Sequence, residues 1–246
     1  MTCIVLTNAT GSPGVTTTAV GLALAWPRDV CLVEANPHTD LAISAGYLRG
    51  APHAHKGLLG VAEALRTQQA FSVTEHCVQI TKDEPVTRYF FPGPTKPSEP
   101  TLFAPVWQRV FEAFAETNSL DVIVDAGRVG HRGLGGELAA MADVLLLVLR
   151  SSLPSIAGAH LYLPQLRAQA AATDKGLELL LVGQNRPYKV TEVQQQFSLP
   201  VTAALPWDET RARAFSEGEP QDRKFEQSSY WKALTATAKR MAAHHE

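Results

Sequence analysis

The stretch Thr10-Gly11-Ser12-Pro13-Gly14-Val15-Thr16-Thr17-Thr18 decides the fold of this protein. It follows directly after an apolar run, Cys3–Thr7, and it opens a helix-length stretch, Thr16–Trp26, that ends before Pro27. A glycine-rich turn in this position presents backbone N–H groups at the N-terminus of a helix, where the helix dipole also favours negative charge. We therefore expect an anion site immediately after the first strand.

Short apolar runs alternate with helix-length stretches along the chain. The runs are Cys3–Thr7, Val30–Glu34, Val122–Ala126, Val144–Leu149, Leu177–Val182 and Val201–Leu205, with a short one near Val78–Thr81. The helix-length stretches are Thr16–Trp26, Leu58–Arg66, Ala104–Glu116, Ser155–Ala172 and Ser228–His244. Because the runs are rich in leucine and β-branched residues and do not alternate with polar positions, they are typical of strands buried on both faces. The pattern predicts an α/β fold, a doubly wound and mostly parallel sheet of about seven strands with helices on both faces.

Composition and charge exclude several classes of protein. Apolar residues make up 45% of the 246 positions and charged residues 19%, which argues against global disorder. Lys plus Arg number 22 and Asp plus Glu number 24, so the chain lacks the basic excess typical of a nucleic-acid-binding domain. No apolar run reaches the ~18 residues of a membrane span, and Met1–Thr7 predicts a strand rather than a signal peptide. We expect a cytoplasmic protein that forms a single domain over residues 1–246.

Two further features concern the interior and the surface. Cys3, Cys31 and Cys77 lack the spacing of a metal or redox motif, so we expect reduced, buried thiols. The segment Phe91–Pro100 holds four prolines and one glycine, which predicts a surface loop rather than a helix or a strand.

Two phosphate-binding motifs compete for the glycine-rich loop. The first is a P-loop, GxxxxGK[ST], in which Thr16 would supply the hydroxyl that binds Mg²⁺, although Val15 stands at the lysine position. The second is a dinucleotide-binding turn, in which Glu34 would hold a ribose, although Thr17 stands where a third glycine is needed. A turn that holds no ligand is the third alternative, and the loop alone does not decide among the three.

The remaining motifs favour the P-loop. The segment Thr10–Thr17 resembles the deviant P-loop KGGxGKTT of the ParA/MinD family of ATPases. Other segments resemble family elements in the same order. Val30–Pro37 resembles the second strand with its D-x-D-P-type end, and Asp121–Asp125 resembles the Walker B strand. Gly183–Arg186 resembles the V-x-N-R element near the adenine, and Leu205–Asp208 with Ala214 and Gly218–Pro220 resembles the P-x-D…A…G-x-P segment. Phe90–Pro94 is similar to the LPGP stretch of the TadZ/CpaE branch, which acts in pilus localisation. Together these resemblances cover nearly the whole chain and imply the P-loop NTPase fold.

The resemblance also implies the site residues and the cofactor. Nucleotide binding is expected from Gly11, Ser12, Pro13, Gly14, Val15, Thr16, Thr17, Asn185, Pro206 and Asp208. Thr16 and Asp125 would bind the metal. The implied cofactor is ATP or ADP with Mg²⁺, bound weakly or not at all, and the implied assembly is a homodimer. Ligands of such folds bind at the carboxyl ends of the strands, so we expect the site there.

The departures from the family fall on the chemistry. Val15 replaces the phosphate-binding lysine, and Thr10 replaces the signature lysine that reaches the partner's nucleotide across the dimer. Glu34 and Asn36 stand where the family has two aspartates, and Ala126–Arg128 follow the Walker B acid in place of Thr-Pro-Pro. Each lost lysine removes a charge-assisted hydrogen bond worth roughly 1.5–3 kcal/mol. Hydrolysis suffers more, because it depends on cations near the γ-phosphate.

Three arginines near predicted strand ends, Arg128, Arg132 and Arg150, are candidates for replacing the lost cations, although each also fits a solvated surface position. We interpret the chain as a degenerate ParA/MinD-like protein that acts as a spatial organiser or docking factor for a cellular machine, with weak or absent ATP hydrolysis. The machine would be the division apparatus, a partitioned chromosome or plasmid, a pilus or a secretion system. An active Mg²⁺-dependent ATPase with substituted cations and a nucleotide-independent scaffold are the alternatives.

The expected partners are a second copy of the chain and the proteins of a positioning system, which would recruit the chain to a membrane, a pole or the nucleoid. The stretch Ser228–His244 is similar to the membrane-targeting helix of MinD, but its narrow, alanine-rich apolar face favours packing on the sheet. Short basic pairs such as Arg211 and Arg213 give weak support for DNA contact, because acidic residues interleave with them.

Overall fold

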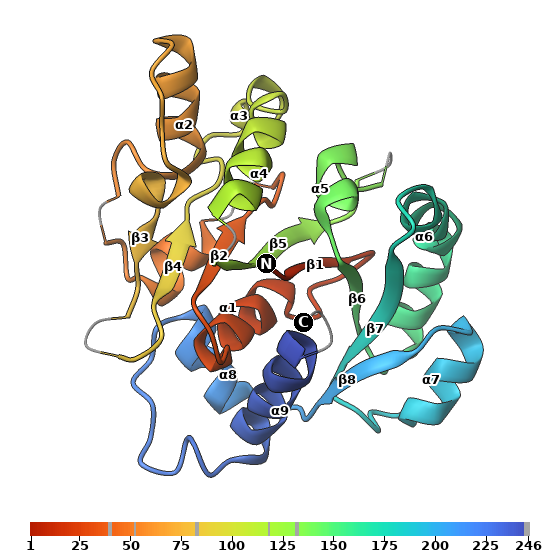
Figure 1. The fold of residues 1–246 in the computed structure, drawn as a ribbon. Coiled ribbons are helices and arrows are strands. Elements are labelled where there is room, and N and C mark those ends of the chain that lie inside the picture. The colour runs from red at the N-terminus through yellow and green to blue at the C-terminus, as the bar shows by residue number, and fades with distance from the viewer. Residues whose placement is uncertain (39–40, 52, 82–83, 118, 131–132, 244–246) are drawn as a thin grey trace.

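The structure, a computed structural model, describes residues 1–243 except 39–40, 52, 82–83, 118 and 131–132. Its strands are β1 (Cys3–Asn8), β2 (Val30–Glu34), β3 (Val78–Gln79), β4 (Arg88–Phe91), β5 (Asp121–Arg128), β6 (Val144–Arg150), β7 (Gly176–Val182) and β8 (Val201–Leu205). They form one sheet in the order β3-β4-β2-β5-β1-β6-β7-β8, in which every pair is parallel except β3 with β4. The predicted doubly wound, mostly parallel sheet is confirmed (Figure 1).

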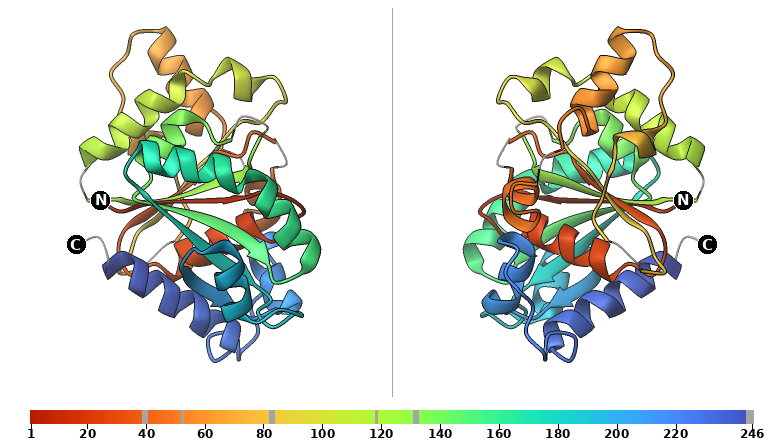
Figure 2. Two further views of the ribbon diagram at one scale, coloured as in Figure 1. Left: turned by 90° about the vertical axis from the view of Figure 1, so that its right-hand side faces the viewer. Right: turned by 90° about the vertical axis from the view of Figure 1, so that its left-hand side faces the viewer.

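The helices cover both faces of the sheet (Figure 2). They are α1 (Val15–Ala25), α2 (Gly57–Arg66), α3 (Glu99–Leu102), α4 (Val106–Thr117), α5 (Gly136–Met141), α6 (Leu153–Ala172), α7 (Val190–Phe197), α8 (Glu209–Ser216) and α9 (Ser229–Ala243), with a π-helical turn over Ala42–Tyr47 and a 3₁₀ turn over Val73–His76. Side chains of α1, α8 and α9 pack on one face of the sheet, and those of α2, α4, α5, α6 and α7 pack on the other.

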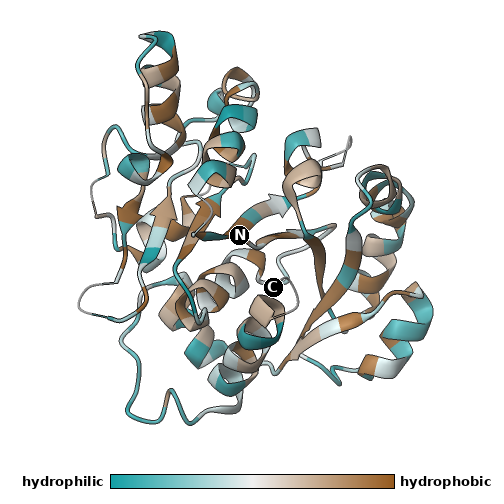
Figure 3. Cartoon of the chain, viewed as in Figure 1, coloured by the Kyte–Doolittle hydropathy of each residue, from teal (hydrophilic) through white to brown (hydrophobic). Residues whose placement is uncertain are grey.

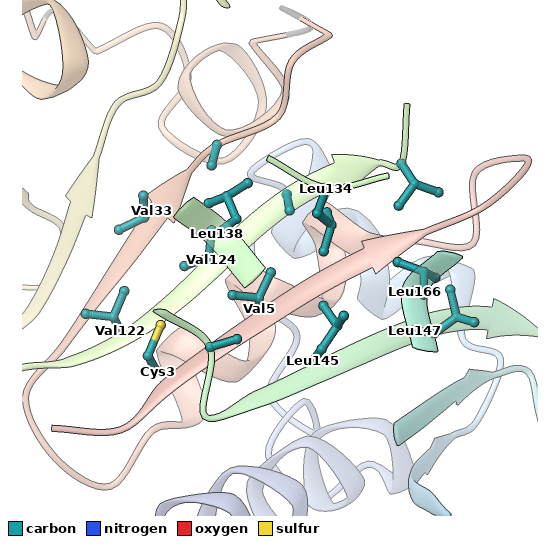
Figure 4. Close-up of a cluster of buried hydrophobic side chains, with 14 of the residues drawn as sticks. Cys3, Val5, Val33, Val122, Val124, Leu134, Leu138, Leu145, Leu147 and Leu166 are labelled. Atoms are coloured by element: carbon teal, nitrogen blue, oxygen red, sulfur yellow. The ribbon is translucent and has the colours of Figure 1, made fainter. Parts of the chain in front are cut away.

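The core consists of one apolar layer on each face of the sheet. Successive residues of β1 alternate between the layers, with Cys3 and Val5 in one and Ile4 and Leu6 in the other. Figure 4 shows the first layer, in which Val5 of β1 and Val124 of β5 lie among leucines. The central strands contribute apolar side chains to both layers. Figure 3 shows apolar residues along the strands and a mixture of polar and apolar residues along the helices. This two-sided burial explains why the strands appear in the sequence as continuous apolar runs.

The structure corrects the interpretation of Phe91–Pro100 as a surface loop. Phe91 ends β4, a strand missed in the sequence, and Pro92, Gly93 and Pro94 are buried. The Gly93 N–H donates to Oε2 of Glu34 at 3.3 Å, and the Pro92 carbonyl accepts from Leu58 N–H at 2.9 Å. Only residues 95–98 are exposed, before α3 begins. Proline cannot donate to a sheet, but it packs well beside the end of a strand where its carbonyl is paired by a neighbouring helix.

The strand β4 was hidden because it starts with a charged residue. Arg88 is buried, and its guanidinium donates to the carbonyl oxygens of Ala23 at 3.1 Å and Trp26 at 3.3 Å. These contacts at the end of α1 satisfy the guanidinium donors inside the fold. A tertiary contact of this kind leaves no local signal in the sequence.

Buried polar groups also close the amino-terminal edge of the sheet. Asp121, at the start of β5, accepts hydrogen bonds from Thr2 N–H at 2.7 Å, Trp26 Nε1 at 2.8 Å and Arg28 Nε at 2.9 Å.

The three cysteines are buried free thiols, as predicted, and the Cys31 and Cys77 sulfurs lie 3.7 Å apart. Burial raises the pKa of the Cys3 and Cys31 thiols well above the usual range.

Candidate functional site

The glycine-rich loop connects β1 to α1 and leaves the first turn of that helix open. Gly14 caps the helix with φ +96°, a left-handed conformation that favours glycine, and Gly11 has φ +69°. A Cβ atom on Gly11 would meet no other atom within 4 Å, so this side of the loop faces open space. The first helical bond runs from Thr18 N–H to Gly14 O at 2.8 Å, and the N–H groups before it have no acceptor within the helix. The loop is therefore built to bind an anion.

A cavity of about 470 Å³ adjoins this loop at the carboxyl ends of the strands, where the sequence predicts the site. It lies beside the adjacent strands β1 and β5, whose outgoing connections run in opposite directions, from β1 through α1 to β2 in one half of the sheet and from β5 through α5 to β6 in the other. Its lining consists of Asn8, Gly11–Thr18, Asn36, His38, Gly127, Arg128, Arg150, Val182, Pro206–Glu209, Ala212 and Tyr230. The cavity has the size and position of a ligand site in a fold of this class.

Most of the predicted nucleotide-binding residues meet in this cavity. Gly11, Ser12, Pro13, Gly14, Val15, Thr16, Thr17, Pro206 and Asp208 all line it. Asp208 also caps α8, where it accepts from Arg211 N–H at 3.1 Å and pairs with the Arg211 guanidinium at 2.8 Å. Asn185 is exposed and is not part of the lining; its N–H donates to Tyr188 O at 3.1 Å. The prediction for Asn185 therefore gains no support from the geometry of the cavity.

The side chains at the predicted acidic and metal-binding positions make hydrogen bonds within the fold. Glu34 is 5% exposed, accepts from Gly93 N–H and is not part of the cavity lining. Asn36 does line the cavity, and its Oδ1 accepts from His38 N–H at 3.0 Å. Asp125, the predicted metal ligand, is 1% exposed, is not part of the lining and accepts from Gly127 N–H at 2.9 Å. Thr16 is thus the one predicted metal ligand that borders the cavity.

The two positions at which the sequence lacks lysine are occupied by packed side chains. Val15 is 5% exposed and belongs to the apolar layer beneath α1, while its outer edge borders the cavity. Thr10 lies against α6, so closely that a Cβ atom on Gly158 would overlap its side chain. Neither residue supplies a cation, and Thr10 is committed to a contact within its own chain.

Arginine supplies the positive charge of the cavity instead. Arg128 and Arg150 both line it, whereas the third candidate, Arg132, lies outside the described residues. The Arg128 Nε donates to Ala9 O at 3.2 Å, and the Arg150 Nη2 donates to Ser12 O at 2.9 Å. Arg128 and Arg150 are both exposed, and both border the cavity, so they are not surface residues remote from the site.

Trp207 is a functional candidate that sequence reasoning missed. Its ring lies in the cavity wall, with the Arg150 guanidinium 4.5 Å and the Arg186 guanidinium 5.9 Å from its centroid. The signal that could have found it was its place between Pro206 and Asp208, which the sequence does predict as site residues. Tyr230 of α9 also lines the cavity, and burial together with the nearby Asp208 raises the pKa of its hydroxyl.

The surfaces considered for membrane and DNA contact are occupied by contacts within the chain. The apolar side of α9 is packed inward, with Leu234, Ala238 and Met241 buried in the layer that contains α1. Arg211 pairs with Asp208 and Asp222, and Arg213 pairs with Glu217 and Glu219. Within the described residues, no helix combines the length and the apolar character needed to cross a membrane.

Comparison with known proteins identifies the class of fold. No family model matches the chain, and no curated protein matches it by sequence. Among solved structures, it is similar to the cell division ATPase MinD of Pyrococcus furiosus, with a TM-score of 0.75 and 17% identity over 99% of both chains. It is also similar to the septum site-determining protein MinD of Pyrococcus horikoshii in complex with Mg-ADP, with a TM-score of 0.73 and 16% identity over 97% of this chain and 95% of the other. A ParA family ATPase of Chlorobium tepidum gives a TM-score of 0.72 and 18% identity over 97% of this chain and 98% of the other.

These matches, together with the sheet order, show that the chain has an α/β fold of the P-loop NTPase type. Its particular fold is that of the MinD and ParA structures, as the sequence predicts. At this level of identity the likeness establishes the fold, and the activity depends on the residues of the cavity.

Proposed function

We propose that this chain is a degenerate member of the ParA/MinD family that binds an adenine nucleotide weakly, hydrolyses it slowly or not at all, and acts as a positioning or docking protein. The observation that carries this proposal is the loop after β1, which keeps its open N–H groups but has buried Val15 at the lysine position. A loop that binds phosphate through its backbone but lacks the lysine charge favours nucleotide binding over nucleotide hydrolysis.

The residues present fit a nucleotide and its metal ion. The cavity of about 470 Å³ has room for a nucleotide, and the open side of Gly11 permits close approach of phosphate oxygens to the backbone. Thr16 would hold Mg²⁺ through its hydroxyl, and Asp125 of β5, which is buried outside the lining, would act on the ion only through one of the waters that Mg²⁺ retains. When bound, Mg²⁺ neutralises charge on the phosphates.

The groups that would activate water are poorly placed for that role. Glu34 is buried against Gly93, and Asn36 carries an amide, which does not accept a proton at neutral pH. Thr10 has neither the charge nor the reach of a lysine that completes a partner's site, so we propose a homodimer whose assembly does not depend on that contact.

A positioning role is supported by the similar structures, one of which is a septum site-determining protein. The machine served would be a division, partition, pilus or secretion apparatus, and the buried Phe90–Pro94 stretch, which resembles that of TadZ/CpaE members, does not select among them. An active ATPase is the second candidate, because Arg128 and Arg150 line the cavity and could supply the missing charge.

Calorimetric titration of ATP and ADP, with and without Mg²⁺, followed by a steady-state hydrolysis assay tests the proposal. We expect that the nucleotide binds measurably and that ATP is hydrolysed more slowly than is usual for ParA/MinD ATPases, or not at all. Mg²⁺-dependent hydrolysis that Asp125→Ala abolishes would establish the active ATPase instead. If neither nucleotide binds, the chain is a nucleotide-independent scaffold and the proposal is wrong.

A further inference from the structure

Arg150 is placed to face a ligand at the glycine-rich loop. It ends β6, lines the cavity, and donates from Nη2 to the carbonyl oxygen of Ser12 at 2.9 Å. Among the described residues, no carboxylate lies within ion-pair distance of it, although Asp208 and Glu209 line the same cavity. A guanidinium has five N–H donors, so one bond to Ser12 leaves most of its donors and its full charge for a ligand.

We propose that Arg150 is the residue that binds the phosphate chain in place of the missing loop lysine. The proposal rests on the proposed function, since it names the cation of the same site. Arginine presents two parallel N–H donors to a phosphate and keeps its charge at all physiological pH values. Arg150 thus returns one of the two lost charges for binding, from the end of a neighbouring strand, while the charge lost at Thr10 stays missing, in keeping with slow or absent hydrolysis.

Trp207 holds the guanidinium in this place. The Arg150 guanidinium carbon lies 4.5 Å from the ring centroid, within the range in which a cation is attracted to an aromatic face. A cation over an aromatic ring is held without using its N–H donors as conventional hydrogen bonds, and the bond to Ser12 O directs one of these donors toward the loop. The ring and the loop carbonyl together orient Arg150 before a ligand arrives, which reduces the entropy lost on binding.

The other two nearby arginines are less suited to this role. Arg128 lines the cavity but donates to Ala9 O, where β1 leads into the loop, and it also borders a second, smaller cavity. Arg186 lies 5.9 Å from the same tryptophan ring but is not part of the lining. Arg186 therefore provides a matched control, because it carries the same charge beside the same ring.

The test compares Arg150→Gln, Arg150→Lys and Arg186→Gln with the unaltered protein, by calorimetric titration of ATP, ADP and inorganic tripolyphosphate. We expect Arg150→Gln to weaken ATP and tripolyphosphate by about 10- to 100-fold, because a charge-assisted hydrogen bond is lost. Arg150→Lys should recover part of the loss, and Arg186→Gln should change the affinity for tripolyphosphate, which carries no adenine, by less than about threefold, because Arg186 is not part of the cavity lining. Unchanged melting temperatures establish that the variants are folded.

The outcomes separate the two proposals. If the unaltered protein binds ATP and Arg150→Gln binds it equally well, the role of Arg150 is wrong and the proposed function stands. If tripolyphosphate binds in an Arg150-dependent way but ATP does not, the role of Arg150 stands and the nucleotide function fails. Equal losses of tripolyphosphate affinity in Arg150→Gln and Arg186→Gln would overturn the assignment, since they would reflect net charge alone. If the unaltered protein binds none of the ligands, both proposals are wrong.

Discussion

Restoring the lysine at position 15 should tighten nucleotide binding at a measurable cost in stability. Val15 borders the cavity with its outer edge while the rest of its side chain is buried beneath α1. A lysine there would keep its stem against the apolar layer and extend its ammonium group into the cavity. The change Val15→Lys therefore adds one cation to a site whose backbone cradle is already in place.

The size of both effects follows from this geometry. One charge-assisted hydrogen bond to a phosphate is worth about 1.5–3 kcal/mol, so ATP affinity should rise about 10- to 150-fold. Loss of the buried valine costs about 1.5–3 kcal/mol at 5% exposure. With an entropy of unfolding of about 0.5 kcal/mol/K for a chain of this length, the melting temperature should fall by roughly 3–6 °C.

Val15→Met is the matched control, because methionine is unbranched and of similar length but uncharged. Differential scanning fluorimetry measures the stability of both variants, and calorimetry with Mg-ATP measures affinity. The reasoning is refuted if the lysine variant is folded and binds ATP no more tightly than the methionine variant, since the added charge would then not reach the phosphates.

Three further predictions concern the framework around the site. Asp121→Asn weakens the hydrogen bonds and the half-buried ion pair that buried Asp121 makes with Arg28, and it should cost about 1–3 kcal/mol in a urea titration. Glu112→Gln, at an exposed pair with Arg109, should cost less than about 1 kcal/mol, and equal costs would contradict the role of buried Asp121. Gly93→Ala would place a Cβ atom 2.0 Å from the Glu34 carbonyl oxygen and should lower the free energy of unfolding by about 1–3 kcal/mol. Gly136→Ala, whose Cβ atom would meet no atom within 4 Å, should leave that free energy unchanged or raise it. An unchanged stability in Gly93→Ala would show that the contact relaxes freely. Iodoacetamide at pH 8 should leave the folded chain unlabelled and label all 3 cysteines after unfolding, as mass spectrometry would reveal. Because burial raises the folded pKa of Cys3 and Cys31 above the ordinary 9.0, their contribution to the free energy of unfolding should be fully present below pH 9 and decline as the pH rises further, and labelling of the folded chain would contradict their burial.

The sequence predicted the strands that are buried on both faces, because these carry an uninterrupted apolar signal. β2 and β8 begin and end at the predicted residues, and α1 begins one residue earlier than predicted. Short helices such as α7 and α8 were missed, since eight residues give too few turns for a clear amphipathic period. The strand β4 was missed for a different reason, because Arg88 is satisfied by carbonyl groups at the end of α1.

The composition of the loop by itself determined that an anion site follows β1 and that its lysines are absent, because both facts depend only on residue type and local spacing. Which cation stands in the cavity was decided by the tertiary structure. Arg150 and Trp207 are 57 positions apart in the numbering and come from two different strand ends, which the parallel sheet brings to one edge. Likewise, only the fold turns Glu34 toward Gly93 and lays Thr10 against α6, since contacts between segments distant in sequence have no local pattern.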